Sequence, residues 1–94
     1  MKFKDDPDIL KKMTNMGMFA YSADQVINIL DIDDGPEFKA AFDNKDSDIR
    51  KAYAQGKDKL LLTMDQSLMA AAKKGNLDAK RELESRIKKR ETGR

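Results

Sequence analysis

The side chains in this sequence that could do chemistry are four cations near the middle of the chain. They are Lys39, Lys45, Arg50 and Lys51. Cations in such a group can neutralise the phosphates of DNA, which supplies much of the binding free energy of DNA-binding proteins. Acidic residues at 31–34 come just before them and would repel phosphate. We therefore predict that these four residues make the phosphate contacts if this region binds DNA; the alternative is that they only solvate the surface.

The aspartates between residues 31 and 34 could also ligate a divalent cation. An EF-hand loop needs oxygen ligands at positions one, three and five, glycine at six and glutamate at twelve. Counted from Asp31, Gly35 falls at position five and Phe42 at position twelve. Because the pattern fails, we predict no metal site and assign Asp31, Asp33 and Asp34 to turn and cap chemistry.

Catalytic residues are not predicted. The chain contains no cysteine and no histidine, which excludes thiolate nucleophiles, thiolate zinc sites and the commonest general base. Ser22 and Ser47 lie where helix caps are needed, and no histidine is present to activate either hydroxyl. Since no glycine-rich phosphate loop occurs, we expect a protein with no enzymatic activity, no cofactor and no small-molecule substrate.

The composition favours helices as the elements that position these cations. Leucine, methionine and alanine provide 24 of the 94 residues, whereas valine occurs once, a bias toward helix over strand. No stretch alternates apolar and polar residues for long. We predict an all-α fold of five helices with one modest core.

Three helices should form a helix-turn-helix-like domain over residues 1–46. Asp6, followed by proline, indicates the start of the first helix, and Gly17 indicates a left-handed end. Ser22 begins a capping box that opens the second helix. The third helix should begin around Pro36.

Residues 47–94 predict a long antiparallel helical hairpin with a basic C-terminal end. A helix over about residues 48–74 should end at Gly75, and Asn76 should cap the fifth helix. So short a break between two amphipathic helices is typical of two helices that run antiparallel.

The long helix carries an apolar seam of heptad-like spacing. Its length of roughly 40 Å exceeds what the three-helix domain can cover. We therefore predict a homo-oligomer whose interface includes four residues of the seam. They are Tyr53, Leu60, Met64 and Leu68. The alternative is that the N-terminal helices fold back over the seam.

Charge is distributed unevenly along the chain. Residues 1–46 hold six lysines and ten acids, a net −4, whereas residues 47–94 hold thirteen basic and seven acidic residues, a net +6. The basic run at 86–90 suits a helix C-terminus, and it could also bind phosphate or an acidic partner. No apolar run is long enough for a membrane span and no signal peptide is evident, so we expect a cytoplasmic protein without a membrane partner.

Three segments of the chain carry a family likeness. They are FAYSADQVINIL at 19–30, AYAQGK at 52–57 and LMAAAKKGNLDA at 68–79. In this order and spacing they resemble the small terminase subunits that package phage DNA. The resemblance covers about residues 19–87. It implies a viral or prophage protein without catalytic activity, acting in the host cytoplasm, that recognises double-stranded DNA and assembles into rings through its hairpin. It also implies a large, ATP-hydrolysing terminase subunit as partner.

The resemblance implies that the helix near residues 37–43 is the recognition helix. That helix offers Glu37, Lys39 and Asp43, which departs from the basic and amide side chains that usually read bases. Two alternatives therefore remain. One is a dimeric helix-turn-helix transcription regulator, and the other is a helical module that binds only protein.

Overall fold

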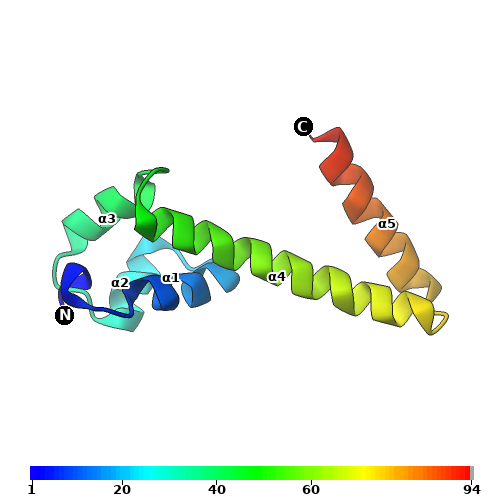
Figure 1. The fold of residues 1–94 in the computed structure, drawn as a ribbon, viewed down its shortest axis with the longest axis horizontal. Coiled ribbons are helices and arrows are strands. Elements are labelled where there is room, and N and C mark those ends of the chain that lie inside the picture. The colour runs from blue at the N-terminus through cyan, green and yellow to red at the C-terminus, as the bar shows by residue number, and fades with distance from the viewer. Residues whose placement is uncertain (94) are drawn as a thin grey trace. The chain divides into compact units, whose positions relative to one another are not determined.

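The computed structural model describes residues 1–93, and these form helices joined by short turns, with no strand among them. A short 3-10 helix, η1 (Phe3–Asp5), precedes α1 (Ile9–Met18), α2 (Ala23–Leu30) and α3 (Gly35–Asp43). The long helix α4 (Asp48–Lys73) and then α5 (Leu77–Thr92) complete the chain. The predicted all-α class and the five α-helices are confirmed (Figure 1).

Two compact units divide the chain, and the boundary lies between Leu60 and Leu61. The sequence placed the boundary at 46/47. The N-terminal unit extends further because Ile49, Tyr53 and Gly56 of α4 are buried with the first three helices. Figure 1 shows η1 and α1–α3 gathered around the beginning of α4.

The core of the N-terminal unit is built around aromatic rings. The buried cluster comprises Phe3, Met13, Val26, Ile32, Phe38, Phe42, Ile49 and Tyr53. Edge-to-face contacts join Phe3 to Phe38 and Phe42 to Tyr53, with ring centroids 5.4 and 4.8 Å apart. η1 was not predicted from sequence, and it brings Phe3 into this core.

Capping signals located the second helix correctly and the first only in part. The Ser22 side chain accepts from the Gln25 amide while the Gln25 side chain accepts from the Ser22 amide, so the predicted capping box is confirmed. The α1 helix begins at Ile9, two residues later than the proline predicts. The Asp6 carboxylate instead closes the preceding turn by accepting from the Asp8 amide.

Gly17 does not end α1 in a left-handed conformation, as its position in the sequence predicted. It lies inside the helix and is buried, and Ala20 takes the positive φ, 55°, after the helix ends. Gly17 is needed for a different reason, which is that the backbone of Tyr53 lies against it.

The second unit, from Leu61 on, holds the end of α4 together with α5, which is compatible with the antiparallel hairpin predicted for residues 47–94. Gly75 has a φ of +96° and Asn76 accepts from the Ala79 amide, so both predicted signals are confirmed. Asp65 of α4 binds two arginines of α5, Arg86 and Arg90, which fixes the antiparallel pairing of the two helices.

Candidate functional site

The four cations predicted to contact phosphate occupy different environments in the N-terminal unit. Lys45 is exposed in the loop before α4, and Lys51 is exposed on the first turns of α4. Lys39, on α3, lies 2.7 Å from a carboxylate oxygen of Asp24 on α2. This ion pair offsets the positive charge of Lys39, so Lys39 is the least available of the four to phosphate.

Arg50 is held by aromatic rings. Its guanidinium carbon lies 4.8 Å from the ring centroid of Phe42 and 5.0 Å from that of Tyr53. Cation–π contacts with two rings restrict the movement of a guanidinium and leave its N–H groups available. No ion pair within residues 1–93 involves Arg50.

Lys57 completes this cationic surface and was missed in the sequence. Its ammonium nitrogen lies 5.6 Å from the same Tyr53 ring, one heptad after Arg50 on α4. The spacing of Arg50, Tyr53 and Lys57 was a usable signal, because residues three, four and seven apart lie on one side of a helix.

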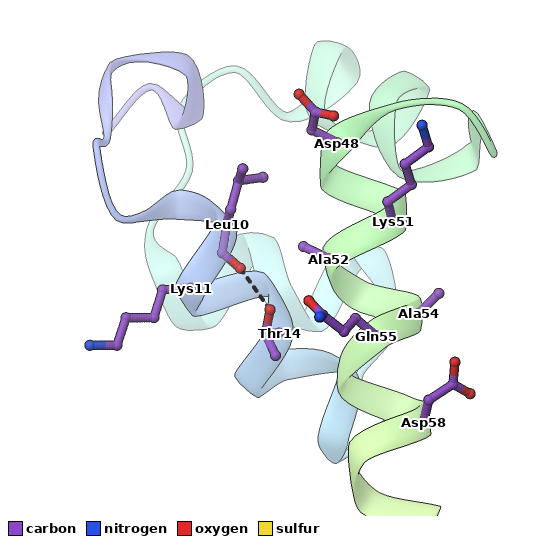
Figure 2. A pocket seen from close by; sticks show the side chains of 9 residues that line it. All are labelled: Leu10, Lys11, Thr14, Asp48, Lys51, Ala52, Ala54, Gln55 and Asp58. Atoms are coloured by element: carbon purple, nitrogen blue, oxygen red, sulfur yellow. Dashed lines mark hydrogen bonds between the residues drawn. The ribbon is translucent and has the colours of Figure 1, made fainter.

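A groove of about 620 Å³ lies between α1 and α4 beside Lys51 (Figure 2). Lys11 and Lys51 line it together with Asp48 and Asp58, and the exposed Leu10 lies at its α1 wall. Figure 2 shows Lys11 pointing away from α4. Because the groove mixes both charges, it lacks the single sign of charge that would select an anion.

The acidic turn between α2 and α3 anchors the beginning of the chain. The Met1 ammonium donates to the Asp31 carbonyl and to the Asp33 carboxylate, each at 2.7 Å, and the Phe3 amide donates to Asp34 at 3.1 Å. The hydrogen bond that the Met1 ammonium donates to Asp33 raises the pKa of this ammonium. No group of three or more metal-ligating side chains occurs within residues 1–93.

Asp65 organises the hairpin electrostatically. Arg90 binds its carboxylate through both terminal nitrogens, at 2.6 and 3.2 Å, and Arg86 binds it through Nε at 2.9 Å. These hydrogen bonds, first from Arg90 and then from Arg86, lower the pKa of Asp65. One terminal nitrogen of Arg86 is buried without a partner.

The predicted oligomer interface is only partly available on the surface. Tyr53 is 5% exposed in the core of its own unit, so it cannot contribute to a contact between chains as expected. Met64 is 40% exposed, whereas Leu60 and Leu68 are half-buried. The prediction therefore stays open for these three residues, whereas the burial of Tyr53 in its own unit argues against its role in the interface.

Two apolar surfaces of the hairpin lie on opposite sides of α4. We call Leu61, Met64 and Leu68 the α4 stripe. We call the hollow between α4 and α5, lined mainly by Met69, Ala70, Lys73, Leu83 and Ile87, the hairpin groove. Because helix positions advance by about 100° per residue, stripe and groove point in roughly opposite directions. The groove was missed in the sequence because it exists only once the two helices meet.

No protein-family model, curated protein or solved structure matches this chain. Among the helices of residues 1–93, none combines the length and apolar character that crossing a membrane requires.

Proposed function

We propose that this chain is a non-enzymatic, cytoplasmic DNA-binding assembly protein of the small terminase type. In this role the N-terminal unit binds double-stranded DNA and the hairpin joins copies of the chain. A large terminase subunit would be the further partner, and no cofactor takes part. The order and spacing of the three resembling segments suggest the family, and the surfaces of the two units support the division of labour.

The observation that supports self-association most directly is that little of the hairpin's apolar surface is buried within its own chain. Among residues 61–93, only Ala79 and Leu83 are buried apolar residues. Six larger apolar side chains are at least 40% exposed there. They are Leu61, Leu62, Met64, Met69, Leu77 and Ile87. An isolated pair of helices with so small a core is marginal in water, and a second pair supplies the missing surface.

The exposed apolar area is of the size that a stable association needs. Full burial of a half-exposed leucine, isoleucine or methionine gains roughly 1 kcal/mol. If each hairpin buries its stripe side against one copy and its groove side against another, each contact between copies covers the equivalent of six side chains, a gain on the order of 6 kcal/mol. That gain is comparable to the loss of translational and rotational freedom that association must offset.

DNA binding is supported by the cations around the start of α4. Arg50, Lys45 and Lys51 form no ion pair within residues 1–93, so their charges are available to phosphates. The acids of the preceding turn, which would repel DNA, are partly neutralised by the Met1 ammonium. Weak contacts of this kind become strong when an assembly presents many copies to one DNA.

Absolute mass in solution, measured by light scattering at two salt concentrations, tests the assembly role. We expect the wild-type chain to form an assembly of several copies and Met64→Asp with Met69→Asp to lower its mass. Ser85→Asp adds one of the same charges on the exposed outer side of α5 and should leave the mass unchanged. A wild-type monomer would exclude self-association, and a dimer would favour the transcription regulator.

A further inference from the structure

Two cations on α4 share one aromatic support. Arg50 lies over the rings of Phe42 and Tyr53, and Lys57 approaches the Tyr53 ring. The Tyr53 ring is fixed in turn, because it is buried and makes an edge-to-face contact with Phe42. Both cations therefore rest on the rigid core of the N-terminal unit and are ordered before any ligand arrives.

Neither cation has an acidic partner within residues 1–93. Other cations of the chain do, since Lys4 pairs with Glu37 and Lys12 with Asp6. Contacts between a guanidinium and ring faces use none of its N–H donors. A lysine ammonium likewise keeps donors free when it lies over a ring. The surface thus holds two ordered, unsatisfied sets of donors.

The spacing of the two cations fits a polymer of anions better than a single small anion. They are seven residues apart on α4, so their backbones lie about 10 Å apart along the axis. Ala54 lies between them on the exposed side of the helix and is too short to obstruct an approaching strand. A nucleic-acid strand carries one phosphate about every 3.4 Å along its axis, so separate phosphates can meet both cations at once.

We propose that Arg50 and Lys57, supported by Tyr53, are a phosphate clamp for the backbone of DNA. The clamp rests on the proposed DNA-binding function and specifies it in two ways. It adds Lys57 to the contact surface, and it makes α4 the principal contact in place of α3, which the resemblance implies as the recognition helix. Contacts to phosphate fix the position of a protein on DNA without reading its sequence, so the clamp binds duplexes of any sequence.

The salt dependence of DNA binding tests the clamp, measured by fluorescence anisotropy with a labelled duplex of mixed sequence. Log affinity falls as log salt concentration rises, and each lost phosphate contact makes this slope less steep by about 0.9. We expect this reduction for Arg50→Gln and for Lys57→Gln, with affinity lower on the order of tenfold, the effect of losing a hydrogen bond to a charged group. Arg50→Lys should keep the slope and lose affinity, because the charge stays and the planar fork of N–H donors is lost.

Lys4→Gln is the matched control, since it removes the same charge from a lysine that is already paired with Glu37 and is not among the predicted phosphate contacts. Its slope should equal that of the wild type. Equal slopes for all variants, or the same reduction for Lys4→Gln, would overturn the clamp while leaving DNA binding intact. A wild-type chain that does not bind DNA would overturn the DNA-binding function itself. The thermal midpoint of each variant, measured alongside, separates a loss of folding from a loss of the phosphate contact. Lys57 is exposed, so we expect its replacement to leave the chain folded.

Discussion

Gly17 of α1 and Gly56 of α4 lie where the two helices cross, and each lets the backbone of the other helix come into direct contact. A Cβ atom on Gly17 would lie 2.0 Å from the Tyr53 carbonyl oxygen, and one on Gly56 would lie 1.9 Å from that of Thr14. Both distances are far below van der Waals contact, and the opposing atoms are backbone. The crossing therefore tolerates no side chain at either position.

Gly56→Ala should destabilise the N-terminal unit although alanine is the better helix former. Alanine gains about 1 kcal/mol in a helix interior, but the helices must separate to admit the methyl group. We expect a net loss of about 2–3 kcal/mol, seen as a thermal midpoint lower by roughly 10 °C or more.

Gly35→Ala is the control for this loss, because the nearest atom to its added methyl is Ile27 Cδ1 at an ordinary 3.7 Å. Its midpoint should change little. A Gly56→Ala chain as stable as the wild type would show that α1 and α4 do not cross this closely.

The same glycines show which parts of the fold the sequence could predict. Local signals such as Ser22, Gly75 and Asn76 act within a few residues, and each lies where it was expected. Gly17 looked like another local signal, but its role depends on Tyr53, 36 positions away. A left-handed stop and a close approach of helices both favour glycine, so the residue type alone could not separate them.

The candidate surfaces likewise have features that the sequence could predict and features that depend on tertiary contacts. Arg50 could be named from its charge alone. Its stacking on Phe42 requires α3 and α4 to be in contact, which no spacing within one helix reveals. Tyr53 was assigned to an interface because it lies on the apolar seam, yet the first half of that seam is covered by the chain's own N-terminal helices.

Ser47→Ala should weaken the junction between α3 and α4. The Ser47 hydroxyl accepts from the Arg50 amide at 3.1 Å and donates to the Ala41 carbonyl, so it connects the end of one helix to the start of the next. Loss of an N-cap costs about 1–2 kcal/mol. Thermal unfolding followed by circular dichroism should show the loss, whereas Ser67→Ala, on the exposed surface of α4, should leave the midpoint within error. Equal midpoints for both variants would contradict the cap.

Acid should weaken the hairpin through Asp65. Its pKa is lowered in the folded chain by Arg90 and Arg86, so the folded state binds fewer protons than the unfolded state. The stabilisation is present above the unfolded pKa of about 3.9 and is lost as the pH falls through the lower folded value. We expect Asp65→Asn to be less stable than the wild type at pH 7, and the difference to close below about pH 4.

Thermal unfolding of both chains across this pH range measures the effect. Glu82→Gln, which removes an exposed acid from α5, should keep the acid sensitivity of the wild type. The contribution of Asp65 is refuted if Asp65→Asn shows the same acid sensitivity as the wild type.

Two possible contacts between hairpins, stripe to groove and stripe to stripe, predict different results when variants are mixed. If the α4 stripe of one copy binds the hairpin groove of the next, Met64→Asp and Met69→Asp each abolish association, because each removes one half of the same contact. Mixed together, the two variants should form a species of two chains, in which the intact stripe of one enters the intact groove of the other, and growth should stop there. If the stripe instead binds a second stripe, Met69→Asp alone should keep the wild-type mass and the mixture should form no new species. Light scattering of the two variants, separately and mixed, distinguishes these two contacts. We expect the two-chain species, because Met64 and Met69 lie on different sides of α4 and both side chains are exposed apolar surface that needs a partner.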